Sequence, residues 1–241
     1  MQYDAYNTHK IWEYCSNSIK NCNINNLYQN KEFMGTMFCE SFVEHELKYL
    51  LKNYENNTDY INSITKETLP NLSNGNLIHQ FYHITNFYNY VGYKFFNEPI
   101  TEFGAGYGGL CKVIHKLEFK NRYNIIELPN LKGLQQQYLQ DIKNEKNINW
   151  YSNHNEFNQE NKHYGTFIAL WSLSETPQKT RDYYLYESNF DQYFFAYGDE
   201  FYDMKNLEYF NRFIEIKSSL IWQKITIPFM SGQYYLMGKK C

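Results

Sequence analysis

Arginine is scarce in this sequence. Only Arg122, Arg181 and Arg212 occur among 241 residues, and the formal net charge is −3 with a pI near 6.2. Proteins that bind nucleic acid along its phosphate backbone carry a basic patch or stripe. The composition therefore predicts no nucleic-acid partner.

Long apolar runs and paired cysteine motifs are also absent. No stretch approaches the roughly 18 apolar residues of a membrane span, and the first ten residues, MQYDAYNTHK, hold no signal-peptide core. The five cysteines are an odd number without C-x-x-C spacing, which indicates neither a zinc site nor a disulfide framework. We expect a soluble cytoplasmic protein with reduced thiols and no membrane contact, and we assign no metal ligands.

Aromatic residues are abundant, with 25 tyrosines and 18 phenylalanines. They suit a well-packed interior and could also stack on a sugar or a base. The chain is long enough for one core with an extension. Residues 1–98 carry little strand signal and several helical signals, including an apolar stripe over 41–53 and a helix expected from Gly75 to Tyr90. We therefore divide the chain into a helical N-terminal cap, 1–98, and an α/β domain, 99–241.

The stretch from Pro99 to Pro129 reads PITEFGAGYGGLCKVIHKLEFKNRYNIIELP and predicts a β-α-β unit. A short apolar run ending at Phe103 meets four glycines, after which apolar residues recur at helical spacing. A second apolar run, 123–126, ends in Glu127. Parallel pairing of the two strands would place the glycine turn and Glu127 at the same edge of the sheet.

This turn predicts an adenosine-type ligand. Glycines let a ligand approach the main chain, and a helix that begins near Gly108 points free N–H groups toward it. Glu127 follows Gly104 by 23 residues, about where this architecture needs an acceptor for ribose hydroxyls. Gly104, Gly106 and Gly109 also satisfy G-x-G-x-x-G, so a nicotinamide or flavin dinucleotide competes as the ligand.

The sequence EFGAGYGG, with Glu102 two residues before the first glycine, resembles the first motif of class I S-adenosylmethionine-dependent methyltransferases. The segments EFGAGYGGLCKVI, YNIIELPNLKGLQQQYL and ALWSLSE are similar to motifs of the sugar O-methyltransferase family, over roughly 99–175. The resemblance implies S-adenosylmethionine as cofactor, with its ribose on Glu127, where such motifs more often have aspartate. The cofactor-binding residues that it implies are Glu102, Gly104, Ala105, Gly106, Tyr107, Glu127 and Leu128.

The remaining apolar runs complete a predicted sheet. Strands are expected at 147–151, 164–173, 192–197, 220–228 and 233–239. The last two flank a Met230-Ser231-Gly232 turn and predict a hairpin. A mostly parallel seven-stranded sheet with an antiparallel C-terminal hairpin is typical of the Rossmann-like class I methyltransferase fold, whereas a nicotinamide domain usually closes with a parallel strand. The hairpin therefore favours S-adenosylmethionine over a dinucleotide.

Candidate catalytic residues follow the fourth and fifth strands. Glu175, in the tip sequence SLSE, is predicted to face the transferred methyl group and to act as the base. The alternative is a helix N-cap with an acid in or beside the first turn. Asp199, in the turn after the fifth strand, is a second candidate, although a glycine-acid turn is also ordinary loop chemistry.

Substrate contacts are predicted at His79, His83, Ser172 and Arg181. The two histidines lie one turn apart on one helix face, which could equally be a polar or packed face. Arg181 could hold a substrate phosphate bidentately or pair with a surface acid. Asn153, at the tip of the third strand, is predicted to bond the adenine amino group, with a plain polar loop as the alternative.

The family resemblance implies methyl transfer from S-adenosylmethionine to a sugar hydroxyl, which yields a methyl ether and S-adenosylhomocysteine. The implied sugar is a nucleotide-activated hexose or heptose, or a precursor of a capsule or lipopolysaccharide. An NAD(P)-dependent oxidoreductase and a non-catalytic S-adenosylmethionine-binding protein stand as alternatives. The predicted partner is thus a small-molecule sugar or nucleotide sugar, and the N-terminal helices leave homo-oligomerisation open.

Overall fold

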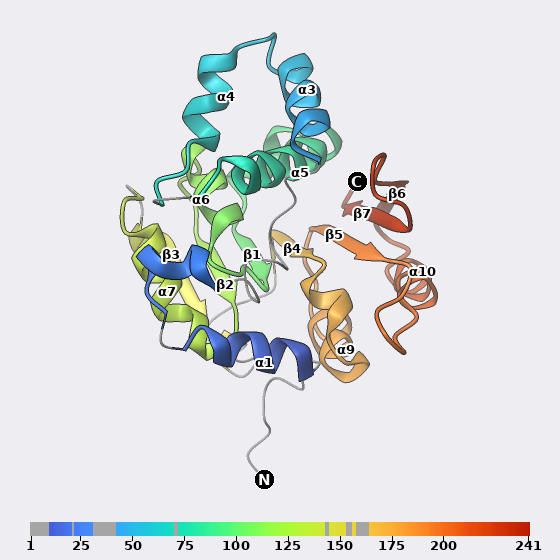
Figure 1. The fold of residues 1–241 in the computed structure, drawn as a ribbon. Helices are drawn as coiled ribbons and strands as arrows, with labels where there is room; N and C mark the ends of the chain where they lie inside the picture. Colours follow the sequence, from blue (N-terminus) through green and yellow to red (C-terminus); the bar gives the residue numbers. More distant parts are fainter. Residues whose placement is uncertain are drawn as a thin grey trace.

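Seven strands of the described chain form one sheet in the order β3-β2-β1-β4-β5-β7-β6 (Figure 1). The computed structural model describes residues 10–20, 22–30, 42–69, 72–142, 145–152, 156–157 and 164–241. The strands are β1 (Ile100–Phe103), β2 (Tyr123–Ile126), β3 (Ile148–Tyr151), β4 (Thr166–Leu170), β5 (Gln192–Gly198), β6 (Ile221–Thr226) and β7 (Gln233–Lys239). Strands β1 to β5 pair in parallel, and β7 runs antiparallel to β5 and β6. The predicted mixed sheet with an antiparallel C-terminal hairpin is confirmed.

The register of the three strands at one side aligns their C-terminal ends. Phe103 at the end of β1 pairs with Ile126 of β2, and Ile126 pairs with Tyr151 of β3. Because parallel strands all point the same way, the segments that follow them emerge at one edge of the sheet. The glycine turn after β1 and Glu127 after β2 therefore lie together, as the spacing predicts.

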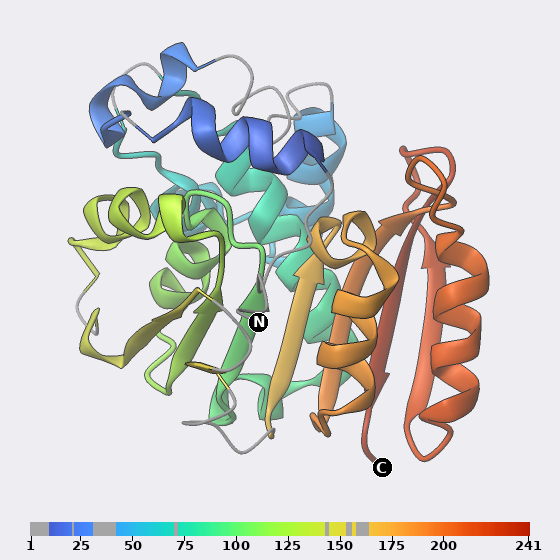
Figure 2. The same cartoon turned by 90° about the horizontal axis from the view of Figure 1, so that it is seen from below.

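Both faces of the sheet are buried at β1, β2, β4 and β5, which explains their continuous apolar runs, whereas β6 at the edge is largely exposed. Alternate residues of β5 divide between two cores: Phe194 and Ala196 belong to the core on the α5 side, and Tyr193, Phe195 and Tyr197 to the core on the α9 and α10 side. Figure 2 shows α9 and α10 in front of the sheet and α5 behind it. A strand covered on both sides needs an apolar residue at every position.

The described residues before β1 are helical. The α-helices are α1 (Lys10–Ser18), α3 (Val43–Asn53), α4 (Thr58–Thr65), α5 (Gly75–Val91), α6 (Gly109–Lys116), α7 (Lys132–Leu139), α9 (Gln178–Tyr186) and α10 (Asn206–Ile216). Short 3₁₀ segments are η1 (Ile24–Gln29), η3 (Tyr93–Asn97), η4 (Pro129–Leu131), η5 (Glu145–Asn147) and η6 (Ser172–Glu175). The boundary between cap and α/β domain stays a prediction. Within the described ranges, no helix has the length and apolar character to cross a membrane.

Helix α1 lies across the C-terminal ends of the strands (Figure 2). It also approaches η4, which follows the tip of β2. A segment from the far N-terminus thus covers the sheet edge where the glycine turn lies. The sequence predicts a helical cap but not this placement.

The fourth strand is shorter than predicted. Strand β4 ends at Leu170, because Trp171 adopts a positive φ of 62° and its N–H donates to the Ala196 carbonyl at 2.7 Å. The backbone then turns into η6 instead of continuing to Leu173. A positive φ at a bulky residue is uncommon and turns the chain out of the extended conformation. The turn brings Ser172 and Glu175 over the sheet edge.

Candidate functional site

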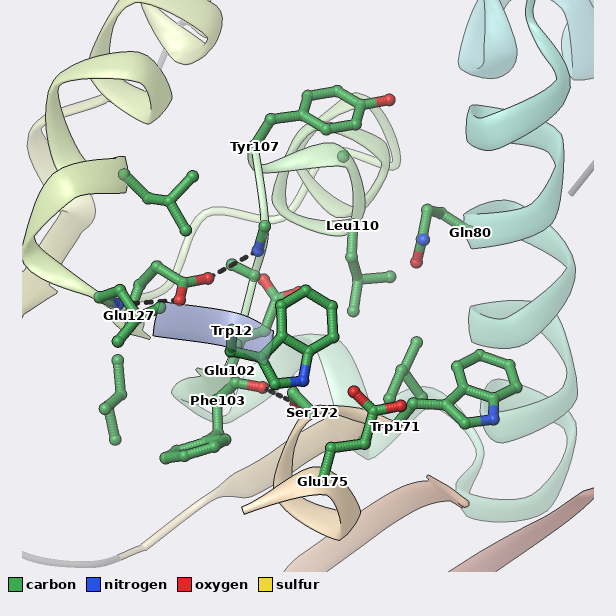
Figure 3. Close-up of a pocket in the computed structure, with 18 of the residues that line it drawn as sticks. Trp12, Gln80, Glu102, Phe103, Tyr107, Leu110, Glu127, Trp171, Ser172 and Glu175 are labelled. Atoms are coloured by element: carbon green, nitrogen blue, oxygen red, sulfur yellow. Dashed lines mark hydrogen bonds between the residues drawn. The ribbon is translucent and has the colours of Figure 1, made fainter. Parts of the chain in front are cut away.

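A cavity of about 350 Å³ opens at the C-terminal edge of the sheet (Figure 3). One side is formed by the turn after β1 and by the residues after β2, and the other by α1, α5, η6 and the turn between β6 and β7. Its volume falls in the range of small-molecule and cofactor sites. We call the first side the glycine-turn half and the second the indole half, after Trp12 and Trp171.

The glycine turn presents bare backbone to the cavity. Gly104, Gly106 and Gly108 all have positive φ values, 74°, 59° and 102°. At Gly104 a Cβ would overlap the side chain of Ser172, whose Oγ would lie 2.6 Å away. Only glycine combines this backbone conformation with such close approach. Ala105 and Tyr107 line the same wall.

Glu127 joins the tip of β2 to this turn. Its Oε2 accepts from the Gly106 N–H at 2.7 Å and its Oε1 from the Leu128 N–H at 2.8 Å (Figure 3). Burial raises the pKa of Glu127 to about 7, against the opposing effect of these two backbone donors. Each carboxylate oxygen keeps a second acceptor site, so two ligand hydroxyls could still be bound. Leu128 also lines the cavity.

Glu102 lies within β1 beneath the turn. It is buried and accepts from the Tyr123 hydroxyl at 2.6 Å. Burial raises its pKa to about 8, and the neighbouring charge of Glu127 adds to the effect, whereas the Tyr123 hydroxyl lowers it. A second buried side chain, Gln135 of α7, donates from its Nε2 to the Gly106 carbonyl at 2.7 Å. The turn is therefore held by Glu127 after β2 and by Gln135 of α7.

The tip of β4 brings Ser172 and Glu175 into the indole half. The Ser172 hydroxyl donates to the Phe103 carbonyl and so ties η6 to β1. Glu175 points into the cavity, and Trp12 of α1 lies beside it (Figure 3). Burial raises the pKa of Glu175 to about 7, against the opposing effects of the Trp12 indole and the charge of Arg181. A carboxyl group with this pKa can gain or lose a proton at neutral pH.

Trp171 forms the opposite wall of the indole half. Its Nε1–H donates to Gln233 Oε1 at 2.7 Å. Its ring stacks on His79 with centroids 5.9 Å apart and planes 16° apart. The indole is thus fixed by β7 on one side and by α5 on the other. These contacts hold Trp171 at its positive φ of 62°. Strained backbone conformations persist where surrounding contacts enforce them, often at functional sites.

The two histidines predicted as substrate contacts differ in their access to the cavity. His79 lines the cavity, whereas His83 is fully buried and outside the lining. His83 Nε2 lies 2.7 Å from His79 Nε2, and its Nδ1 bonds the Tyr235 hydroxyl. His79 Nδ1 in turn bonds Glu46 of α3. The prediction that His83 contacts substrate is therefore corrected: helical spacing puts both rings on one face, but β7 covers the second one.

Arg181 also has a different role from the predicted one. It is buried, and its guanidinium donates to the carbonyls of Ser174 and Thr176 and, at 2.8 Å, to Asn206 Oδ1. It does not line the cavity, and it forms no ion pair among the described residues. This corrects both sequence interpretations: the side chain fixes the η6 backbone that carries Glu175.

Two further predictions concern the strand tips. Asp199 is exposed and lies outside the cavity lining, because its N–H donates to the Gly232 carbonyl at 2.9 Å and extends the pairing of β5 with β7. Its prediction as a base at the cavity is corrected. Asn153 lies outside the described residues, so its adenine contact stays a prediction.

Several lining residues were not predicted from the sequence. They include Trp12, Gln80, Trp171, Met230 and Gln233. Trp171 had a detectable signal, since it directly precedes Ser172 at a predicted strand tip. Trp12 had none, because no local pattern shows that α1 crosses the sheet edge.

The glycine-turn half fits the amino acid and ribose parts of an adenosyl cofactor. Gly104, Ala105 and Gly106 form its wall with little side-chain bulk, and Glu127 stands at its end. The described lining contains no lysine or arginine to pair with a pyrophosphate.

Comparison with known proteins shows the fold. No protein-family model matches the sequence, and no curated protein matches it. The methyltransferase domain of bacterial-CtHen1-CN superposes with a TM-score of 0.52 at 9% identity, over 68% of this chain and 99% of that chain. A chain of the Pnkp1/Rnl/Hen1 RNA repair complex gives 0.51 at 11% identity, over 67% of this chain and 41% of that chain. The chain thus has the Rossmann-like fold of these methyltransferase domains.

Proposed function

We propose that this protein is an S-adenosylmethionine-dependent methyltransferase. The observation that carries the proposal is the turn at 104–106, which consists of two glycines and an alanine. The Gly106 N–H ties it to Glu127 within a cavity at the carboxyl ends of the strands. Open α/β sheets bind their ligands at this edge. The Rossmann-like methyltransferase fold supports the same conclusion.

The residues of the glycine-turn half would hold the cofactor. Gly104, Ala105 and Gly106 would lie along its methionine part, and Glu127 would accept from the ribose hydroxyls. Glu102 lies beneath, where a carboxylate would attract the cofactor's amino group. The cofactor supplies an activated methyl group on a sulfonium. The task left to the protein is to align the acceptor and to exclude water.

Glu175 is the proposed base. It is the carboxyl group that η6 carries into the indole half, and burial brings its pKa to about 7. A hydroxyl is a poor nucleophile at neutral pH, so proton removal by Glu175 would assist formation of the C–O bond. Ser172, Trp171 and His79 would position the acceptor beside it.

The acceptor that we propose is a sugar hydroxyl, in the biosynthesis of a surface polysaccharide. This substrate class rests on the family resemblance of ALWSLSE and the preceding motifs. One of the matched structures is a Pnkp1/Rnl/Hen1 RNA repair complex, but binding to the phosphate backbone of RNA calls for cations. The described lining has none from lysine or arginine, which favours a small acceptor over RNA.

Isothermal titration calorimetry with S-adenosylhomocysteine and with NAD tests the cofactor. We expect saturable binding of the former and none of the latter; the reverse result would establish the oxidoreductase alternative. Mass spectrometry of candidate acceptors incubated with S-adenosylmethionine tests turnover. A gain of one methylene on a sugar supports the proposal, a gain on RNA overturns the sugar assignment, and cofactor binding without any transfer favours a non-catalytic binding protein.

A further inference from the structure

The charged side chains of the described cavity lining are acidic, apart from His79. They are Glu102, Glu127 and Glu175. Burial raises the pKa of each, because an unpaired carboxylate is unfavourable away from water. Glu102 and Glu127 belong to the glycine-turn half, where the proposed cofactor would engage them. Glu175 belongs to the indole half and faces the acceptor.

No lysine, arginine or histidine of the described chain forms an ion pair with Glu175. Arg181 is the cation nearest in sequence, but its donors are committed to the carbonyls of Ser174 and Thr176 and to Asn206. The histidine pair does not replace it. Burial lowers the pKa of His83 well below its usual value, and the Nδ1 of His79 is already bonded to Glu46 of α3. The indole half therefore carries a carboxyl group without a matching positive charge.

Two indole rings flank this carboxyl group. In the view of Figure 3 the Glu175 carboxyl lies between Trp12 and Trp171. Trp171 is fixed by Gln233 and stacked on His79, so its ring cannot turn away freely. The face of an indole attracts a cation, and it does so more strongly where water is excluded. An acid beside two indoles, in a site that excludes water, can therefore attract an ammonium group.

We propose that the indole half binds an ammonium group, so that the acceptor is an amino-bearing small molecule such as an amino sugar. The inference rests on the proposed function for the identity of the reaction, but cation binding can be measured without turnover. The ammonium lies against Glu175 and the indoles of Trp12 and Trp171. Its positive charge keeps Glu175 ionised, which is the form that accepts a proton from the neighbouring hydroxyl.

The first experiment uses tetramethylammonium as the probe. The protein is saturated with S-adenosylhomocysteine, which fills the glycine-turn half and carries no sulfonium, and tryptophan fluorescence is followed during titration. We expect saturable binding of tetramethylammonium and none of tert-butanol, a neutral molecule of similar shape. Equal binding of the two, or binding of neither, would overturn the proposal. Failure of S-adenosylhomocysteine to bind would instead refute the proposed function.

Variants then assign the site. Glu175→Gln and Trp12→Leu should each weaken tetramethylammonium binding about tenfold, whereas Trp12→Phe keeps an aromatic face and should lose less. Glu208→Gln, at an exposed position of α10, is the matched control and should bind like the parent protein. Unchanged affinity in both Glu175→Gln and Trp12→Leu would place the cation elsewhere and overturn the assignment.

The cofactor's own sulfonium is the competing cation. If Glu175 contacts the sulfonium, Glu175→Gln should weaken S-adenosylmethionine binding while leaving S-adenosylhomocysteine binding intact. If Glu175 instead contacts the ammonium of the acceptor, both cofactor affinities should stay within about twofold of those of the parent protein, because the residue does not touch the cofactor. A selective loss of S-adenosylmethionine affinity would therefore overturn the acceptor assignment. In turnover, glucosamine should be methylated faster than N-acetylglucosamine, which lacks the charge.

Discussion

The backbone N–H of Gly106 donates to the Oε2 of Glu127 at 2.7 Å, which joins the turn after β1 to the tip of β2. The same carboxylate accepts from Leu128, so its position is fixed by two backbone donors before any ligand arrives. Preorganised acceptors cost less to engage than mobile ones. This contact makes Glu127 the first position at which the proposed cofactor site can be tested.

Glu127→Ala should weaken binding of S-adenosylhomocysteine by at least about tenfold, because hydrogen bonds from ribose hydroxyls to a charged carboxylate contribute more than neutral ones. Calorimetric titration measures the effect. Glu145→Ala, at an exposed residue of η5, serves as the control and should bind normally. An unaltered affinity in Glu127→Ala would remove the ribose role from this residue.

Gly104→Ala should destabilise the protein by about 2–4 kcal/mol and abolish cofactor binding. The backbone at this position is left-handed, which is unfavourable for alanine, and the new Cβ would overlap Ser172. Chemical denaturation measures the free energy of unfolding. The matched control is Gly133→Ala in α7, where nothing lies within 4 Å and alanine should stabilise the helix by about 0.5–1 kcal/mol. Adding Ser172→Gly should recover part of the loss, and equal stability of the two alanine variants would contradict the steric argument.

Arg181→Met should lower the free energy of unfolding by about 2–4 kcal/mol, because it leaves the carbonyls of Ser174 and Thr176 without their buried donor. Turnover should fall more than cofactor affinity, since the η6 backbone that carries Glu175 loses its anchor. Thermal denaturation and the separate measurement of kcat and of S-adenosylhomocysteine affinity test this. Arg212→Met, at an exposed position, should change stability by less than about 0.5 kcal/mol. Parallel losses of turnover and affinity would argue against a role confined to η6.

Glu175→Gln should reduce turnover about 10²-fold or more while leaving binding of S-adenosylhomocysteine unchanged, because the amide keeps the shape but cannot accept the proton. In the parent protein kcat/KM should rise with pH through the free-enzyme pKa of about 7. Timed assays between about pH 5 and 9, with detection of the methylated product by mass spectrometry, test the loss of turnover and the pH dependence. Parent-like turnover in the variant would exclude Glu175 as the base.

Stability in the absence of ligand should fall as the pH rises from about 5 to 8. Glu102 has a pKa near 8 in the folded protein and an ordinary value near 4.5 when unfolded, so the folded state binds more protons across this interval. Glu102 alone then lowers the free energy of unfolding by up to about 1.4 kcal/mol per pH unit. Glu127 and Glu175, each with a pKa of about 7, lower it further in the same direction. Glu102→Gln should flatten the dependence of Tm on pH, and the exposed Glu145→Gln should not. A dependence that is equally steep in Glu102→Gln would assign it to other groups.

Local patterns fixed the elements that lie close together in sequence. The run Ile100–Phe103, the glycines and Glu127 form one β-α-β unit, so their relative placement follows from strand pairing alone. The pattern at His79 and His83 gave the correct helix face but not what covers it, because Tyr235 lies 152 residues after His83. Arg181 was misassigned for the same reason: Asn206, one of its acceptors, belongs to α10.

The sequence by itself determined the mixed sheet, the glycine turn and the acid at its edge, since hydrophobic periodicity and glycine placement act over a few residues. The tertiary structure alone decided that α1 carries Trp12 over the sheet edge, that Trp171 turns the chain into η6, and that Arg181 faces inward. These outcomes depend on packing between segments far apart in the chain, which no local pattern encodes.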